Sequence, residues 1–303
     1  MTGAIDTAAD AAETPERAPQ ASAIPCASGR GADAHAWSLL AQVPAAPRAR
    51  LFWVPALGVA AKHYLGFAEA LAAQGVAVFV HEWRGLGSST WRAGHQRDWG
   101  YRELLIEDLP SSDAAMRAAL PELPTLYGGH SLGGQLAACH LALSAQPAHA
   151  LWLVASGAPF WRTFPGPRGW ALPLIYRFLP WLSDRNGALP GRRIGFGGNE
   201  ARTVIRDWTR TGLSGRYAGA GIADDIEAAL AGVDTRIHAV RLRDDWLVPQ
   251  ASLDFLVAKM PKARAATRVL DRAALGARAD HFAWIRRPQA VAEALIESLR
   301  SNA

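Results

Sequence analysis

One serine lies in the pattern that exposes a nucleophile between a strand and a helix. Ser131 is the centre of Gly129–Gly133, the only Gly-x-Ser-x-Gly segment in the sequence. A short apolar segment ending at Tyr127 precedes it, and an apolar segment beginning at Leu132 follows it. A serine in such a turn is strained, and its hydroxyl group is exposed at the carboxyl end of the strand. An ordinary glycine-rich turn is the alternative, but the predicted strand and helix favour a nucleophile.

The expected base is a histidine near the end of the chain. A serine hydroxyl attacks a carbonyl efficiently only when a base accepts its proton, and where this turn performs acyl transfer the partners follow in the order serine, acid, histidine. Of the nine histidines, His281 lies in a predicted loop before the last helix. We therefore expect His281 to be the base, with a surface role as the alternative. His140 and His238 lie inside a predicted helix and a predicted strand, where packing or a surface position is expected.

Two adjacent aspartates are candidates for the acid that orients this base. Asp244 and Asp245 follow a predicted strand, in the chain order that the triad requires. Successive residues near a strand end point to opposite sides, so only one of the two is expected to reach His281. Asp280 is too close to His281 in sequence to be its natural partner. An ordinary turn is the alternative, because aspartate is common in turns.

Acyl transfer also needs N–H groups that stabilise the oxyanion of the tetrahedral intermediate. We expect one to be the backbone N–H of Leu132, at the start of the helix after Ser131, where the helix dipole is favourable. The second is expected from the loop Pro55–Gly58, at the N–H of Leu57.

The elements that must position these residues alternate between strands and helices. Apolar runs without polar alternation, such as 75–80, are typical of parallel strands covered on both faces. The alternation predicts an α/β fold with a mostly parallel, doubly wound sheet built from right-handed crossovers. The predicted strands are 35–43, 50–55, 75–80, 124–127, 151–155, 233–242 and 266–270, and the predicted helices are 64–73, one within 101–120, 132–144, one from 249, and 289–299.

The alternation stops in the middle of the chain, which indicates an insertion. Residues 157–217 are rich in proline, glycine and tryptophan, and they read as a largely helical cap. Residues 21–156 and 218–303 form the predicted core, and residues 1–20 read as a flexible tail. A length of 303 residues accommodates one large domain with such an insertion.

Composition and charge exclude several other classes. The net charge is +5, yet only three of the 32 basic residues are lysines, and the arginines are spread along the chain without a basic run. We therefore expect no nucleic-acid partner. The longest apolar stretch, 170–182, is interrupted by Pro173, Arg177 and Pro180, so no membrane span is expected.

The cysteines and histidines predict neither disulfides nor a metal site. Cys26 and Cys139 are the only cysteines, they lie far apart, and the histidines are dispersed. Cys139 is expected to be a small buried helix residue. We expect no cofactor. The start of the chain lacks the basic and apolar regions of a secretory signal, so a cytoplasmic location is expected.

In these residues and their order, the chain resembles the α/β-hydrolase superfamily, in particular its serine aminopeptidase-like and monoacylglycerol-lipase-like branch. The resemblance implies the α/β-hydrolase fold and assigns the acid to Asp245 rather than Asp244. Two departures are that Pro55-Ala56 replaces a common His-Gly pair and that Glu82 replaces the usual aspartate before Arg-Gly-x-Gly. The matching segments are Pro55–Gly58, Arg84–Ser88, Gly129–Gly134, Asp245–Pro249 and His281-Phe282.

The function expected from these residues is hydrolysis of a carboxylic ester through a covalent acyl-enzyme, with Ser131, Asp245 and His281 as the triad. The substrate is expected to be a small-molecule ester, and the cap aromatics suggest an apolar acyl or aryl pocket, although they could equally serve to pack the cap. Alternatives are an acyltransferase, an amidase or peptidase, and a noncatalytic ligand-binding protein of the same fold.

Overall fold

The centre of the molecule is an eight-stranded sheet with the order β1-β2-β4-β3-β5-β6-β9-β10. The structure, a computed structural model, describes residues 21–29, 34–144 and 146–300, so the predicted tail 1–20 lies outside the described residues. β2 runs antiparallel to β1 and β4, and the remaining neighbours are parallel. The strands are β1 (Ser22–Ser28), β2 (His35–Gln42), β3 (Ala49–Val54), β4 (Val76–Val80), β5 (Thr125–His130), β6 (Ala150–Val154), β9 (Arg236–Leu242) and β10 (Arg264–Leu270).

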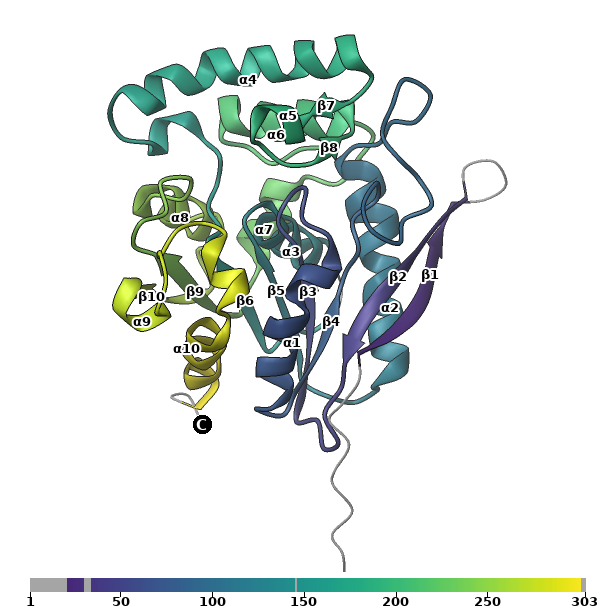
Figure 1. The fold of residues 1–303 in the computed structure, drawn as a ribbon, viewed down its shortest axis with the longest axis vertical. Coiled ribbons are helices and arrows are strands. Elements are labelled where there is room, and N and C mark those ends of the chain that lie inside the picture. The colour runs from purple at the N-terminus through teal and green to yellow at the C-terminus, as the bar shows by residue number, and fades with distance from the viewer. Residues whose placement is uncertain (1–20, 30–33, 145, 301–303) are drawn as a thin grey trace, which may run out of the picture.

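Helices cover both faces of this sheet, which confirms the predicted fold class (Figure 1). α1 and α10 pack on one face, and α2, α3 and α7 pack on the other. The helices are α1 (Leu65–Ala72), α2 (Leu109–Ala119), α3 (Leu132–Leu143), α4 (Gly166–Asn186), α5 (Gly191–Ile194), α6 (Arg202–Ser214), α7 (Ile226–Gly232), α8 (Gln250–Val257), α9 (Arg272–Leu275) and α10 (Gln289–Arg300). Shorter turns are the 3-10 helices η2 (Ala61–Tyr64), η4 (Trp161–Thr163) and η5 (Ala283–Arg286) and the π-helical turn η3 (Glu103–Asp108).

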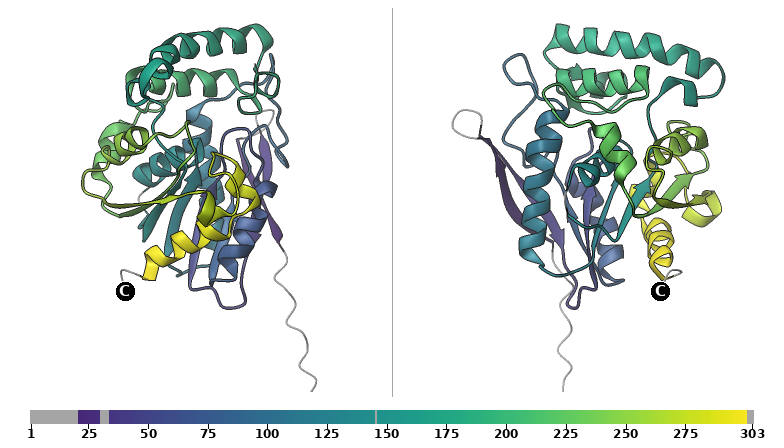
Figure 2. Two further views of the ribbon diagram at one scale, coloured as in Figure 1. Left: turned by 60° about the vertical axis from the view of Figure 1, so that its left-hand side comes forward. Right: turned by 180° about the vertical axis from the view of Figure 1, so that it is seen from behind.

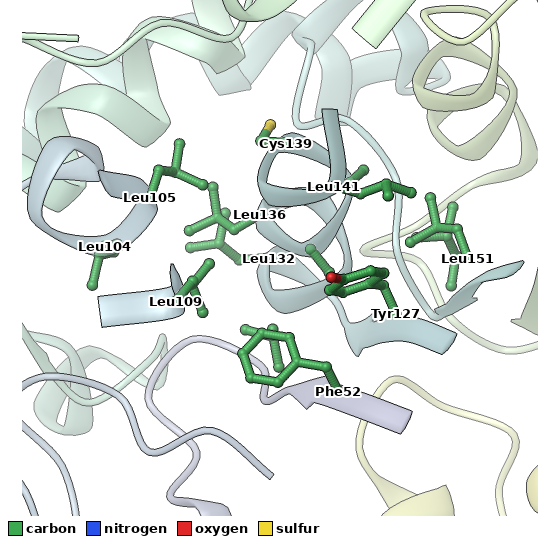
Figure 3. Packing of buried hydrophobic residues seen from close by; sticks show 14 of the residues in the cluster. Phe52, Leu104, Leu105, Leu109, Tyr127, Leu132, Leu136, Cys139, Leu141 and Leu151 are labelled. Carbon is green, nitrogen blue, oxygen red and sulfur yellow. The ribbon is translucent and has the colours of Figure 1, made fainter. Parts of the chain in front are cut away.

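Alternation along the strands builds a separate hydrophobic core on each face. In β3, Phe52 and Val54 join one core, whereas Leu51 and Trp53 join the other. This is the side-chain period of two that a strand imposes. Figure 3 shows the first core, where leucines of α3 and of the segment 104–109 lie around Phe52 and Tyr127. Burial on both faces explains why the central strands are continuously apolar.

Most of the segment between β6 and β9 forms a separate layer beyond the carboxyl ends of the strands, whereas α7 at its end packs on the sheet (Figure 2). This layer contains α4, α5, α6 and the small antiparallel pair β7 (Leu189–Pro190) and β8 (Asn199–Glu200). α4 is outermost, and α6 lies between it and the core. We call residues 157–217 the cap. None of the described helices, α4 included, is both long and apolar enough to cross a membrane.

Two elements differ from what the sequence indicates. β1 was not predicted, because Pro25 and several small residues make it a poor strand by composition; at the edge of a sheet a proline is tolerated. α4 continues through Pro173 and Pro180 over 21 residues. Propensity alone disfavours such a helix, so packing of its inner face against α6 must offset the lost hydrogen bonds.

Candidate active site

Ser131 occupies a sharp turn between β5 and α3. Its backbone has φ 56° and ψ −125°, an unfavourable conformation for a residue with a side chain. Its N–H donates to the carbonyl of Val154 at 3.1 Å, which anchors the turn to β6. A Cβ at position 133 would lie 2.1 Å from the carbonyl oxygen of Val54, so only glycine allows α3 to begin this close to β3. The sequence pattern and the strained geometry therefore coincide at Ser131.

Asp245 and His281 form a buried hydrogen-bonded pair. His281 Nδ1 lies 2.7 Å from Asp245 Oδ2, and both residues are about 95% buried (5% and 4% exposed). The other carboxylate oxygen, Oδ1, accepts the N–H groups of Leu247 at 2.9 Å and Val248 at 3.3 Å. These bonds fix the carboxylate in the orientation in which it meets the imidazole.

Asp244 points away from this pair. Its Oδ2 accepts a hydrogen bond from Arg272 Nε at 2.8 Å, and the hydrogen bond from Arg272 lowers the pKa of Asp244. The two adjacent aspartates thus have different partners, as strand alternation requires. Of the two, the structure brings Asp245 to His281.

Ser131 and His281 line the same cavity, which has a volume of about 440 Å³. No hydrogen bond joins their side chains in the described part of the chain. The rest of the lining is largely apolar and comes mostly from the cap, including Leu172, Ile175 and Leu179 of α4. Among the residues that the structure describes, no Asp, Glu, Lys or Arg lines this cavity, so it suits a neutral, apolar ligand group.

The loop predicted to supply the second oxyanion donor lines the cavity as well. Leu57 and Leu132 are both lining residues, and Leu132 begins α3, where the first N–H groups have no acceptor within the helix. Trp83 Nε1 donates to the carbonyls of Pro55 at 3.0 Å and Ala56 at 3.1 Å. The loop that carries Leu57 is therefore held in a defined conformation.

Tyr64 connects this loop to the turn that carries the serine, a link that the sequence did not reveal. The N–H of Ala56 donates to Tyr64 Oη at 2.9 Å, and Tyr64 Oη lies 2.8 Å from His130 Nδ1. Burial raises the pKa of Tyr64, so the hydroxyl stays protonated and donates a hydrogen bond to His130. Burial and the neighbouring His281 hold the pKa of His130 well below its usual range, which leaves that ring neutral and able to accept.

Glu82 holds a neighbouring loop in place. Its carboxylate accepts the N–H groups of Ala61 at 3.1 Å and Ser88 at 3.3 Å. These bonds give Glu82, which stands where the family usually has aspartate, a structural role in this loop. Burial raises the pKa of Glu82.

The two histidines set aside by the sequence lie away from the cavity. His140 is in α3, and its Nε2 lies 3.2 Å from the Asp113 carboxylate. His238 is in β9 and lines a different hollow of about 580 Å³, near the first residues of β9 and β10. In parallel sheets ligands bind at the carboxyl ends of the strands, which is the edge where Ser131 and His281 lie.

Comparison with known proteins agrees with this architecture. The family model described as "Serine aminopeptidase, S33" matches residues 45–274. A search of curated proteins finds no match.

Solved structures with this fold include several hydrolases. A thermostable carboxyl esterase from Bacillus coagulans is 17% identical with a TM-score of 0.63, covering 93% of this chain and 98% of the esterase. A hydrolase from Pseudomonas aeruginosa is 17% identical with a TM-score of 0.59, covering 90% and 98%. An esterase domain from Rhodothermus marinus is 16% identical with a TM-score of 0.57, covering 93% and 98%.

At these identities the solved structures show the fold, whereas the family model covers most of the chain. Together with the sheet, the strained serine turn and the cavity beside it, this match identifies the chain as an α/β-hydrolase that belongs to the serine aminopeptidase S33 family.

Proposed function

We propose that this protein hydrolyses carboxylic esters through a covalent acyl-enzyme formed on Ser131. The observation that supports this most directly is the buried Asp245–His281 pair, which lies on the same apolar cavity as a serine in a strained turn. A hydrogen bond between nucleophile and base often forms only with substrate bound, so its absence here is compatible with this role.

The roles of the three residues follow from the geometry. Because Asp245 accepts a hydrogen bond from the Nδ1–H of His281, Nε2 is left as the basic nitrogen of the neutral ring. Nε2 takes the Ser131 proton as the hydroxyl oxygen attacks the ester carbonyl. The protonated ring then gives its proton to the leaving alcohol, and water repeats the sequence to release the acid. Asp245 stays ionised and stabilises the imidazolium in both halves.

The oxyanion of each tetrahedral intermediate would be held by the N–H groups of Leu132 and Leu57. Both belong to segments whose positions are fixed, one by the start of α3 and one through Tyr64 and Trp83. Donors that are already oriented need no reorganisation when charge develops, which is the main source of their effect on rate.

The ester's acyl group would occupy the apolar part of the cavity, between Leu132 and the inner face of α4. Carboxyl esterase and esterase domain are the names of two of the similar structures, which supports an ester as the substrate. A cavity of about 440 Å³ has room for an acyl chain longer than acetyl.

Hydrolysis of p-nitrophenyl esters with graded acyl lengths tests this function. We expect kcat/KM to rise from acetate to longer acyl chains and Ser131→Ala to lower kcat by about four orders of magnitude or more. Ser214→Ala, on the exposed end of α6, is the control and should retain activity. Comparable turnover by Ser131→Ala, or no turnover of any ester by the folded wild type, would rule the proposal out.

A further inference from the structure

The outer face of α4 carries a row of large apolar side chains that are more than half exposed, although the ring of Trp170 also lies 5.9 Å from that of Trp161. Trp170, Leu174, Phe178 and Trp181 are 76%, 72%, 51% and 55% exposed. Their spacing of four, four and three residues places them on one side of the helix, and we call them the α4 stripe. In both views of Figure 2, α4 is the outermost element of the cap, so this side is accessible.

The opposite side of the same helix is already used for packing. Tyr176, Leu179 and Ser183 are buried, and the Tyr176 ring lies 5.1 Å from the Trp208 ring of α6. The packing of α4 on α6 therefore uses the opposite side of the helix and not the α4 stripe. Contiguous exposed apolar surface of this kind marks an interaction site.

The charges around the α4 stripe indicate what kind of surface it meets. Arg168, Arg177 and Arg185 of α4 are exposed, and none of them forms an ion pair with a carboxylate of the described residues. The only acid of α4, Asp184, is paired with Arg206 at 2.5 Å. Helical periodicity places Arg177 and Arg185 on the side of the α4 stripe, whereas Arg168 lies over Trp246. The face thus presents aromatic and aliphatic groups together with the uncompensated charge of Arg177 and Arg185.

This combination fits an anionic lipid surface better than a second copy of the chain. Two copies that met through this face would bring the same unpaired arginines together, which is repulsive. Tryptophan at a lipid interface, apolar side chains below it and arginines toward the headgroups are the features of helices that lie in the interface.

The mouth of the cavity adjoins the same surface. Ile175, Trp246 and Phe282 line the cavity and are also 43%, 55% and 46% exposed. Ile175 follows Leu174 of the stripe, and the Arg168 guanidinium lies 5.2 Å from the centre of a Trp246 ring. A surface bound at the α4 stripe would therefore lie close to the entrance.

We propose that the α4 stripe and the arginines beside it bind the protein to an anionic membrane surface, with α4 lying in the interface. This binding does not depend on the proposed hydrolysis. The test therefore uses the Ser131→Ala protein throughout, so that the vesicles stay intact whether or not the wild type attacks lipids.

Sedimentation with vesicles of phosphatidylcholine, with and without phosphatidylglycerol, measures the binding. We expect binding to the anionic vesicles, weakened at high salt and much weaker with phosphatidylcholine alone. Trp170→Ser/Leu174→Ser should lower the partition coefficient about tenfold or more, because two large apolar contacts are lost. Ile106→Ser/Val269→Ser removes apolar side chains of 41% and 39% exposure elsewhere and should leave binding unchanged.

A second pair of variants tests the arginines. The test variant and its control lose the same two positive charges, so only the position of those charges differs. Arg177→Gln/Arg185→Gln should weaken binding to anionic vesicles about thirtyfold, because roughly 1 kcal/mol is lost for each of the two arginines. Arg264→Gln/Arg286→Gln removes two exposed arginines outside the cap and should have much less effect. Thermal unfolding confirms that each variant is folded.

Three results would overturn the proposal. They are no binding to anionic vesicles, equal binding by the α4 variants and their controls, or a dimer in sedimentation velocity that Trp170→Ser/Leu174→Ser dissolves while vesicles bind nothing. The last result would identify a second copy as the partner of the α4 stripe.

Discussion

At the scale of single residues, the site depends on which of two neighbouring aspartates faces the histidine. Residue types and chain order were enough to propose Ser131 and His281 from the sequence. Strand alternation showed that only one of Asp244 and Asp245 would reach His281, but it could not show which, because the direction depends on how the strand ends. The contacts distinguish them, with Asp245 on His281 and Asp244 on Arg272.

This difference predicts opposite outcomes for two isosteric changes. Asp245→Asn should lower kcat by about three to four orders of magnitude, because the amide favours the wrong tautomer of His281 and does not stabilise the imidazolium. Asp244→Asn should stay within about threefold of wild type, since it loses only an exposed ion pair. Steady-state hydrolysis of a p-nitrophenyl ester measures both. A large loss for Asp244→Asn with little for Asp245→Asn would reverse the assignment.

The role of Tyr64 marks the limit of inference from sequence at this scale. Tyr64 lies eight residues after Ala56 and 66 residues before His130, and no local pattern predicts that its hydroxyl bonds to both. Their meeting depends on the way η2 folds back over the end of β3. Such a contact is a product of tertiary structure and leaves no local sequence signal.

At the scale of elements, the cap is held close to the loop that carries Leu57. A Cβ on Gly58, whose φ is +77°, would lie 2.2 Å from the backbone nitrogen of Gly198, so the two loops touch through their main chains. Glu200 in β8 supports the cap side of this contact, because its Oε1 accepts the N–H of Gly198 at 2.6 Å. The sequence indicated an insertion and its helical character, but not this contact.

Burial raises the pKa of Glu200 from its ordinary value of 4.5 to about 7. The unfolded chain loses this proton at lower pH than the folded chain does, so Glu200 lowers the stability of the fold as pH rises from about 4.5 through about 7. The full effect is about 3 kcal/mol. Glutamine has the same shape, can accept the Gly198 N–H, and does not ionise.

The difference in unfolding free energy between Glu200→Gln and wild type should therefore shift by about 3 kcal/mol in favour of the variant when the pH is raised from about 4.5 to about 8. Chemical denaturation at both pH values measures the change. The control is Glu69→Gln, which removes an exposed carboxylate of α1. A difference for Glu200→Gln that is the same at both pH values would contradict a raised pKa.

At the scale of the whole molecule, one buried carboxylate joins segments that the sequence keeps far apart. Asp108, at the end of η3, accepts two hydrogen bonds from Arg84, at 2.8 and 2.6 Å, and one from Ser28 of β1 at 2.8 Å. His35 of β2 lies 3.5 Å away. Burial opposes ionisation of Asp108, but the hydrogen bonds from Arg84 and the nearby His35 ring prevail and lower its pKa to about 2.

Asp108→Ala should lower the unfolding free energy by about 3 to 5 kcal/mol, because the buried Arg84 loses the carboxylate that accepts two of its hydrogen bonds and keeps only the more distant Glu107, at 3.5 Å, as an acidic partner. The exposed pair of Asp184 with Arg206 provides the comparison, and Asp184→Ala should cost less than about 1 kcal/mol. Urea denaturation of both variants measures these changes. Equal losses would mean that the buried network does not hold the edge strands to the sheet.

The overall fold was the part most accessible from the sequence, since alternating apolar strands and helices leave few arrangements open. The position of the α4 arginines on the surface was the feature hardest to predict from the sequence. The arginines read as dispersed, and only the helix α4 places Arg177 and Arg185 on the side that carries the α4 stripe. Side chains that are separated by three to eight residues along the sequence share one side of α4 once this helix forms.

The central claim is that Ser131 is a nucleophile activated by His281. Intact-mass and peptide mass spectrometry after reaction with a fluorophosphonate tests it most directly, because the probe labels only an activated serine and reports its position. We predict one adduct per chain, located on Ser131 and absent from Ser131→Ala and His281→Gln. A folded wild type that remains unlabelled, or a Ser131→Ala protein labelled as well as the wild type, would contradict the claim.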